Sequence, residues 1–324
     1  MSDTRCLTFK AGSFGDFIND KLFTTMVNGQ PAHRFHDIAE IREVLDARSY
    51  VADEDFATAL FLLLKMQKPL LVEGPPGVGK TEIALTLSGI LNTKLIRLQC
   101  YEGLDVHSAV YEWNYQKQLL GIKLQEGTAS TVEEKEKHVF GSDYLLRRPL
   151  LQSIMEEEKS PVLLIDELDR ADEEFEAFLL ELLSAFQVTI PELGTIEAKH
   201  KPYVILTSNR TRELSDALKR RCLYHWIDYP GLDKEMQIVR KRLPGIEETL
   251  LEQVVSVVQQ FRQRKLAKMP GVSETIDWAE SLMALGYREI NRQAFDSTLG
   301  SILKSTEDIQ FVRAEGLEAF KQTA

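Results

Sequence analysis

The sequence predicts an α/β fold, a parallel sheet with helices, followed by a small all-α domain. Short apolar runs typical of buried strands alternate with stretches of helical periodicity between residues 53 and 229. A glycine-rich loop stands between the first of these runs and the helix after it. Beyond Pro230, apolar residues recur only at helical spacing. Strands that alternate with helices indicate a parallel sheet, and the helical remainder indicates a second, smaller domain.

Length and composition limit the classes of protein that fit. The chain has 324 residues, enough for about two domains of roughly 150 residues each. Its formal net charge of −11 opposes a general electrostatic attraction to nucleic acid or to an anionic membrane. No apolar run reaches the roughly 18 residues of a membrane span, and residues 1–16 are charged where a signal peptide would be apolar. We therefore expect a cytoplasmic protein without a membrane span.

The expected elements follow in order along the chain. We expect an N-terminal extension over residues 1–48, with a helix at 38–47. The α/β domain is expected over residues 49–230 and the helical domain over residues 231–324. Strands are expected at 70–74, 95–99, 161–166, 203–209 and 223–229, and a hairpin at 188–190 with 195–197. Helices are expected at 56–64, 83–91, 149–158 and 171–186, and apolar stripes at 250–261, 276–283 and 294–303 predict the helices of the last domain.

Residues from about 102 to 147 interrupt this alternation. The stretch 126–143 is polar and rich in charge, and it is too long for an ordinary connection in a compact domain. We therefore expect an insertion there. Three cysteines, Cys6, Cys100 and Cys222, lie far apart and form no CxxC pair, which predicts reduced thiols and neither a disulfide framework nor a zinc site.

The glycine-rich loop carries the strongest functional motif. GPPGVGKT matches the phosphate-binding pattern GxxxxGK[ST] and stands between a predicted strand and a predicted helix. Its residues are Gly74, Pro75, Pro76, Gly77, Val78, Gly79, Lys80 and Thr81. Glycines let the backbone wrap a polyphosphate so that amide groups and the helix N-terminus face the negative charge. Lys80 is expected to reach the β- and γ-phosphates, and the Thr81 hydroxyl to coordinate Mg²⁺.

A second motif supplies carboxylates. The run VLLIDE ends in Asp166 and Glu167, an apolar strand that delivers acids to its carboxyl end. Asp166 is expected to help bind Mg²⁺ with Thr81, and Glu167 to polarise the attacking water. Phosphoryl transfer depends on positioning and charge neutralisation, so an acid that orients water beside Mg²⁺ favours hydrolysis over transfer to a small molecule. The two motifs together predict a nucleoside triphosphatase.

Two further positions fit this chemistry. Asn209 ends the predicted strand YVILTSN and is a candidate sensor that orients the lytic water near the γ-phosphate. Arg220 and Arg221 stand together at a predicted helix end. Arginine presents a permanently charged fork suited to phosphate, so this pair is a candidate arginine finger acting on the nucleotide of a neighbouring subunit.

The order of these parts resembles that of AAA+ ATPases over residues 50–300. The segments LVEGPPGVGKTEIA, RLQCYEGLD, YEWNYQKQLL, LIDELDRAD and QVTIP are similar to the MoxR family, and with GVSETIDWA they look most like its branch associated with carbon-monoxide dehydrogenase maturation. The resemblance implies an insertion before helix 2, a hairpin before the sensor strand and a helical lid. It also implies ATP and Mg²⁺ as cofactors, hexameric rings, von Willebrand factor A protein partners, and remodelling of a protein client for metal-cofactor insertion.

The resemblance adds residue roles. It favours Arg221 over Arg220 as the finger, extends the nucleotide-binding segment through Glu82, and aligns Tyr50 and Val51 with an adenine-contacting segment. One position departs from the family: Thr275 stands where many AAA+ lids carry an arginine that contacts the γ-phosphate, with Arg292 as a possible substitute.

Two other functions compete with protein remodelling. A nucleic-acid motor of the AAA+ class would use Tyr111, Trp113 and Tyr115 to stack on bases, although the acidic charge and the lack of a basic stripe beside them weigh against it. The same aromatics would otherwise form a small core of the insertion. A small-molecule kinase shares the phosphate-binding loop but not the sensor, arginine pair and helical lid. Nucleic acid is therefore not the expected partner.

Overall fold

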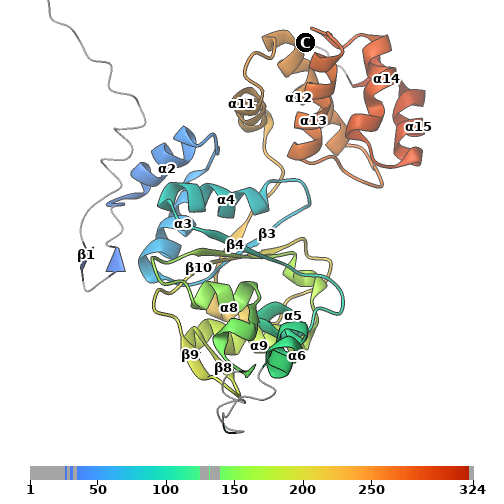
Figure 1. Ribbon diagram of the computed structural model, residues 1–324. Coiled ribbons are helices and arrows are strands. Elements are labelled where there is room, and N and C mark those ends of the chain that lie inside the picture. The colour runs from blue at the N-terminus through green and yellow to red at the C-terminus, as the bar shows by residue number, and fades with distance from the viewer. Residues whose placement is uncertain (1–25, 28–29, 32–34, 125–130, 132–138, 321–324) are drawn as a thin grey trace, which may run out of the picture.

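The computed structural model describes residues 26–27, 30–31, 35–124, 131 and 139–320. It has two parts, a sheet covered by helices on both faces and a bundle of helices formed by the C-terminal part of the chain (Figure 1). The predicted fold class, a parallel α/β sheet followed by an all-α domain, is confirmed. Cys6 and most of the expected N-terminal extension lie outside the described residues.

The central sheet contains five parallel strands. Across the sheet they are β11 (Leu223–Trp226), β3 (Leu70–Glu73), β10 (Tyr203–Ser208), β7 (Val162–Asp166) and β4 (Leu95–Gln99). Every residue of β3, β7 and β10 is buried, which explains why these strands are apolar without alternation. The last strand is three residues shorter than predicted, because after Trp226 the chain leaves β3 where the phosphate-binding loop begins.

Helices cover the two faces of the sheet. On one face lie α2 (Ile38–Ala47), α3 (Glu54–Met66) and α4 (Lys80–Leu91), packed on Leu70, Val72 and Leu164. On the other lie α8 (Pro149–Ile154), α9 (Glu173–Ala185) and α10 (Asp216–Arg221), packed on Leu71, Leu163 and Ile165. Consecutive residues of these strands therefore pack against helices on opposite faces of the sheet.

Helix α2 shares the core of the α/β half of the chain. Its buried residues Ile41 and Leu45 lie in the same cluster as Phe56 of α3. The helix itself occupies the predicted range, and Asp37 caps it by accepting a hydrogen bond from the Glu40 amide. Two short strands precede it, β1 (Met26–Val27) and β2 (Gln30–Pro31), which pair antiparallel. The domain boundary at residue 48 stays a prediction.

The described residues of the interruption at about 102–147 pack on the core beneath the sheet. It contains α5 (Val106–Val110), β5 (Tyr111–Trp113), α6 (Tyr115–Leu124), a 3-10 turn (Ser142–Tyr144) and β6 (Leu145–Arg147), with β5 antiparallel to β6. Trp113 is buried between Phe140, 5.5 Å away, and Tyr111, 6.2 Å away, measured between ring centroids. Two of the three candidate stacking aromatics therefore hold the insertion together.

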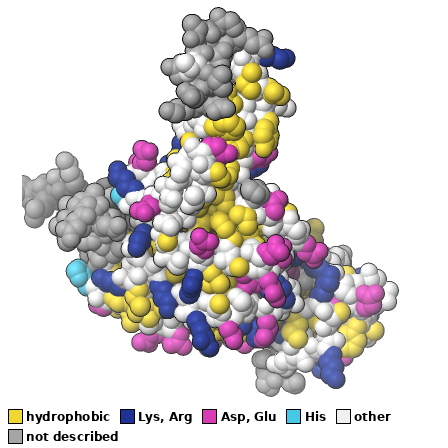
Figure 2. All heavy atoms as spheres, turned by 90° about the horizontal axis from the view of Figure 1, so that it is seen from below, with side chains coloured by type: hydrophobic (Ala, Val, Ile, Leu, Met, Phe, Trp, Pro, Cys, Tyr) yellow, Lys and Arg dark blue, Asp and Glu magenta, His cyan; other side chains and the backbone are white. Residues whose placement is uncertain are grey.

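The outer side of α6 is apolar and exposed. Tyr115, Leu119, Leu120, Ile122 and Leu124 keep about half or more of their surface in solvent. Seen from below, hydrophobic side chains gather in a band on the molecule (Figure 2). The predicted hairpin is present as β8 (Gln187–Ile190) and β9 (Gly194–Glu197), and buried Val188 and Ile190 anchor it to the core under the sheet.

The C-terminal helices form a separate core. They are α11 (Leu232–Arg242), α12 (Glu248–Arg262), α13 (Val272–Ala284), α14 (Arg292–Ile302) and α15 (Thr306–Glu315). Trp278, Phe261, Phe295 and Phe320 form its aromatic centre. The three predicted stripes are confirmed as α12, α13 and α14, whereas α11 and α15 were not predicted. None of the described helices is long and apolar enough to cross a membrane.

Candidate functional site

The loop between β3 and α4 has the shape of a phosphate cradle. Gly77 and Gly79 take positive φ angles of 75° and 90°, a region that side chains disfavour. A Cβ on Gly74 would lie 2.1 Å from the carbonyl oxygen of Ile227, and one on Gly77 would lie 3.0 Å from the Cα of Gly271. The glycines therefore allow both the turn and the close approach of neighbouring backbone. Helix α4 begins at Lys80, so its N-terminus faces the loop.

Lys80 folds back onto this loop. Its Nζ donates hydrogen bonds to the carbonyl oxygens of Gly74, at 2.8 Å, and Pro75, at 2.7 Å. Burial lowers the pKa of the Lys80 ammonium to about 8, although Asp169, Asp166 and Glu167 oppose the shift. The ammonium is therefore held inside the loop beside three carboxylates, where a polyphosphate would be a further acceptor.

This pKa predicts a pH dependence of nucleotide binding. Only the ammonium form of Lys80 attracts phosphate, so without Mg²⁺ the affinity for ATP should fall above about pH 8, by up to about tenfold per pH unit. The folded chain binds fewer protons than the unfolded chain between about pH 8 and the ordinary value of 10.5, so this group stabilises folding as pH rises. The titration of Lys80 itself would thus weaken ATP binding without destabilising the chain.

Calorimetric titration of ATP in EDTA between pH 7 and 9.5 measures this effect. Lys80→Ala is the control, since its weaker binding should not change with pH in the same way. An affinity of the wild-type chain that stayed constant across this range would contradict the role given to Lys80.

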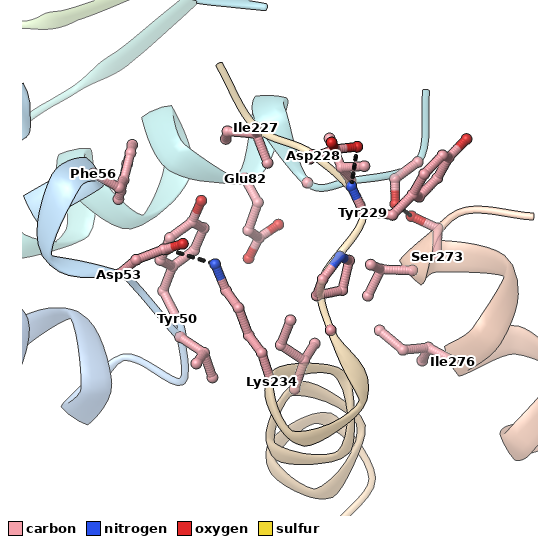
Figure 3. A pocket seen from close by; sticks show the side chains of 18 of the residues that line it. Tyr50, Asp53, Phe56, Glu82, Ile227, Asp228, Tyr229, Lys234, Ser273 and Ile276 are labelled. Atoms are coloured by element: carbon pink, nitrogen blue, oxygen red, sulfur yellow. Dashed lines mark hydrogen bonds and ion pairs between the residues drawn. The ribbon is translucent and has the colours of Figure 1, made fainter. Parts of the chain in front are cut away.

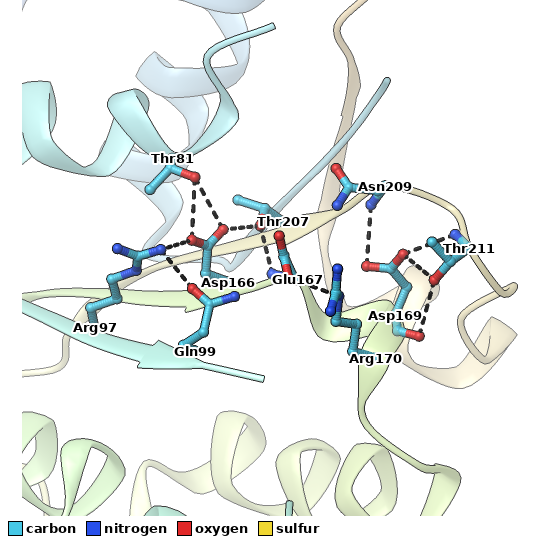
Figure 4. Close-up of polar contacts among 10 residues, drawn as sticks. All are labelled: Thr81, Arg97, Gln99, Asp166, Glu167, Asp169, Arg170, Thr207, Asn209 and Thr211. Carbon is cyan, nitrogen blue, oxygen red and sulfur yellow. Dashed lines mark hydrogen bonds and ion pairs between the residues drawn. The ribbon is translucent and has the colours of Figure 1, made fainter. Parts of the chain in front are cut away.

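Thr81 and Asp166 form a set of hard oxygen donors at the first residues of α4 and the end of β7. The Thr81 hydroxyl donates to both carboxylate oxygens of Asp166 at 3.2 Å. The Thr207 hydroxyl of β10 donates to Asp166 at 2.5 Å, and Arg97 of β4 forms an ion pair with it at 2.6 Å (Figure 4). A hydroxyl and a carboxylate are ligands that Mg²⁺ prefers, and they lie beside the phosphate cradle, so these residues fit that cation.

Glu167 follows β7 in a left-handed conformation. Its φ angle is 55°, which is uncommon for a residue with a side chain, and its amide donates to the Thr207 hydroxyl at 2.9 Å. Thr207 therefore holds both the carboxylate of Asp166 and the backbone of Glu167 in place. The carboxylate of Glu167 pairs with Arg170 at 2.8 Å and is about one third exposed. It is thus within reach of solvent at the edge of the site.

Asn209 stands on the turn after β10 and is held by Asp169. The Asp169 carboxylate accepts hydrogen bonds from the amides of Asn209, at 3.2 Å, and Thr211, at 2.8 Å, and from the Thr211 hydroxyl at 2.6 Å. Arg210, between them, also has a positive φ, 58°. The candidate sensor loop is therefore tied to the loop that carries Glu167, as Figure 4 shows.

A cavity of about 360 Å³ lies between the phosphate-binding loop and the C-terminal helices. Tyr50 and Val51 line it together with Gly77, Val78, Gly79 and Glu82 (Figure 3). Apolar side chains of Phe56, Ile227, Ile238 and Ile276 also face it. The ring centroids of His225 and Phe56 lie 5.2 Å apart, and burial lowers the pKa of His225, which favours the neutral imidazole. The cavity suits a flat, uncharged ring such as a nucleobase.

Helix α11 closes this cavity with basic residues. Lys234 pairs with Asp53 at 2.5 Å and Arg242 pairs with Glu82 at 2.5 Å, and all four residues line the cavity. Lys241, on the same helix, pairs with Asp46. The C-terminal helices are thus joined to the α/β half of the chain by ion pairs around the opening.

Thr275 is buried inside the lid. Its hydroxyl donates to Glu235 at 2.7 Å and to the carbonyl oxygen of Gly271 at 3.0 Å. Glu235 is fully buried and forms a two-pronged ion pair with Arg262, both distances being 2.7 Å. Thr275 therefore belongs to a buried polar network beneath the cavity. Arg292 has a 92% exposed side chain 3.8 Å from Asp296 and lies outside the residues that line the cavity.

Because Thr275 is buried, we expect that the chain does not tolerate an arginine at this position. Thr275→Arg should destabilise the chain by about 3 kcal/mol, because the longer side chain overfills the core and sets a second cation beside Arg262. Thr275→Ser keeps the hydroxyl and should cost about 1 kcal/mol. Urea denaturation measures both. A Thr275→Arg chain with unchanged stability and tighter ATP binding would show instead that this position faces the nucleotide.

Arg220 and Arg221 end α10 and are exposed. The guanidinium of Arg221 donates to the carbonyl oxygen of Leu180 on α9. Neither arginine is among the described residues that line the cavity. Both arginines therefore lie away from the cavity of their own chain.

The structure thus brings the predicted loop, Thr81, Asp166, Glu167 and Asn209 to one edge of the sheet, and places Tyr50 and Val51 at the cavity. Sequence reasoning missed the partners of these residues: Arg97, Gln99, Asp169, Arg170, Thr207, Lys234 and Arg242. One signal was present, since Arg97 and Gln99 are polar residues at alternate positions of an otherwise apolar strand.

Residues 69–222 match the AAA domain family, dynein-related subfamily. An uncharacterized protein of Staphylococcus haemolyticus (strain JCSC1435) is 28% identical over 240 residues, which are 72% of this chain and 81% of the relative. An uncharacterized protein of Staphylococcus aureus (strain NCTC 8325 / PS 47) is 28% identical over 229 residues, 69% of this chain and 77% of the relative.

Solved structures of the Thermotoga maritima RuvB protein are also similar. The RuvB Holliday junction branch migration motor gives a TM-score of 0.41 at 16% identity and covers 81% of this chain and 66% of that one. A single-residue mutant of RuvB gives 0.46 at 17% identity, with coverage of 77% and 69%. These likenesses concern the fold alone. The α/β half of the chain has an AAA+ P-loop fold.

Proposed function

We propose that this chain is a Mg²⁺-dependent ATPase of the MoxR type that works in a ring of identical subunits, most simply a hexamer. Its expected task is to remodel or mature a protein complex, in particular by assisting metal-cofactor insertion into a metalloenzyme, together with a von Willebrand factor A protein. The segments quoted from the sequence support the MoxR assignment, and the exposed apolar side of α6 offers a surface for a protein partner.

One observation carries the ATPase proposal. Thr81, Asp166, Glu167 and Asn209 come from three neighbouring elements and meet beside the phosphate cradle, next to a cavity that suits a base. Mg²⁺, when bound, would neutralise charge on the phosphates. The loop amides and Lys80 would hold the phosphates, Glu167 would accept the proton of the attacking water, and Asn209 would orient that water.

Phosphate release by the purified chain with Mg²⁺ and ATP tests this proposal. The wild-type chain should hydrolyse ATP, and Lys80→Ala should weaken nucleotide binding and lower hydrolysis together. No phosphate release from a folded wild-type chain, under conditions in which it forms oligomers, would reject the ATPase proposal.

The client requires a second experiment. Glu167→Gln should bind ATP and turn it over poorly, which prolongs the ATP-bound state that holds a client. Affinity capture with Glu167→Gln from the native host, compared with Lys80→Ala, should enrich a metalloenzyme and a von Willebrand factor A protein. Equal recovery with both variants would argue against ATP-dependent client binding.

A further inference from the structure

Asp166 is a buried carboxylate that depends on its partners. Its side chain is only 4% exposed, and it lies near two further acids, Glu167 and Asp169. A buried charge is costly unless it is paired and hydrogen-bonded. Two hydroxyl groups, from Thr81 and Thr207, donate to it, but neither carries charge. Arg97 supplies the direct ion pair, with 2.6 Å between its Nη2 and Oδ2 of Asp166.

The position of Arg97 follows from the register of β4. Ile96 and Leu98 point into the core on one face of the sheet, so Arg97 and Gln99 lie on the opposite face. In the register between β4 and β7, Gln99 lies opposite Asp166. Arg97 stands two residues before Gln99 on the same face of β4, so its long side chain reaches the same carboxylate. The Nη2 of Arg97 also donates to the side-chain oxygen of Gln99 at 2.6 Å.

We propose that Arg97 is a positioning residue that takes the place of Mg²⁺ at Asp166 and competes with the cation for that carboxylate. The proposal rests on the ATPase function proposed above. The oxygen that Arg97 contacts, Oδ2, also accepts the Thr81 hydroxyl, so the guanidinium approaches the carboxylate where Thr81 and Asp166 would share a cation. Two cations at one carboxylate repel each other.

The guanidinium of Arg97 is also able to move away from Asp166. Its side chain is 51% exposed, so solvent can hydrate the guanidinium, and Gln99 remains as an acceptor. Asp166 is thus held in one orientation before the metal arrives, and Mg²⁺ with nucleotide displaces the guanidinium. Arg97 should therefore raise the Mg²⁺ concentration that the site requires. A contact of Arg97 with the terminal phosphate is the competing possibility, and it predicts the opposite change.

Isothermal titration with the non-hydrolysable analogue AMP-PNP, in EDTA and over a series of Mg²⁺ concentrations, separates these possibilities. In Arg97→Met, the Mg²⁺ concentration that gives half of the metal-dependent gain in affinity should fall about fivefold. Arg97→Lys keeps the charge and should remain near the wild type. Arg148→Met is the matched control, because Arg148 is also half exposed and ion-paired, with Glu112, but outside the site.

A second readout uses no nucleotide. Mg²⁺ alone should raise the melting temperature of Arg97→Met more than that of the wild type, because Asp166 has lost its resident cation. The melting curves also show whether each variant is folded; should Arg97→Met not fold, Arg97→Gln, which also removes the charge, is measured in its place.

Two results would overturn the proposal. An unchanged Mg²⁺ requirement in folded Arg97→Met or Arg97→Gln would show that the ion pair does not compete with the metal. A higher requirement, or a loss of AMP-PNP affinity only when Mg²⁺ is present, would assign Arg97 to the phosphate. A wild-type chain that did not bind AMP-PNP would reject the ATPase function as well, so the two failures are distinguishable.

Discussion

Replacing Glu167 by glutamine is expected to lower the rate of ATP hydrolysis by about 100- to 10,000-fold while ATP still binds. The backbone at Glu167 is fixed by the hydrogen bond from its amide to Thr207, and the carboxylate reaches the solvent-facing edge of the site. Glutamine has nearly the same size but cannot accept a proton from water. Single-turnover phosphate release measures the rate, and calorimetric titration measures binding.

Glu174→Gln provides a matched control, because Glu174 is an exposed acid in the first turn of α9, close in sequence but not in contact with the site. It should hydrolyse ATP at the wild-type rate. If Glu167→Gln kept full activity, another group would have to activate the water and the role given to Glu167 would be wrong.

Replacing Arg221 by alanine is expected to lower hydrolysis by about 1,000-fold or more without weakening ATP binding. Arg221 is exposed at the end of α10, and its contact is with a backbone carbonyl of α9 rather than with the cavity of its own chain. Its loss should therefore affect the nucleotide of the next subunit. Arg220→Ala, with the same charge change one residue earlier, should have the smaller effect.

Mixing two inactive variants tests this arrangement between subunits. Arg221→Ala keeps an intact phosphate-binding loop, and Lys80→Ala keeps an intact arginine. At interfaces where Lys80→Ala presents Arg221 to an Arg221→Ala subunit, the site is complete, so the mixture should recover part of the activity. Mixtures as inactive as the separate variants, under conditions in which hybrids form, would place the arginine elsewhere.

Much of the fold could be predicted because its signals are local. The strands β3, β7 and β10 are apolar on both faces, and the glycines of the loop between β3 and α4 are required by backbone geometry. The carboxyl ends of parallel strands meet at one edge, so Asp166, Glu167 and Asn209 could be placed near the loop from the order of the elements alone.

The rest depends on contacts that no local pattern shows. Helix α11 packs on the C-terminal core through a narrow stripe of Met236 and Val239, and most of its other residues are polar. Its basic residues pair with acids of the α/β half of the chain, which no local pattern shows. The partner of Thr275, Glu235, lies 40 residues away and is recognisable only once α11 and α13 are packed together. The contact of Arg97 with Asp166 likewise depends on the register between β4 and β7, which the sequence does not show.

The most direct test of the account is the specific rate of Mg²⁺-dependent phosphate release as a function of the concentration of the wild-type chain. An active site completed by Arg221 of a neighbour predicts a specific rate that rises with protein concentration as oligomers form and then reaches a plateau. Absence of phosphate release, or a specific rate that stays constant down to concentrations at which the chain is a monomer, would contradict it.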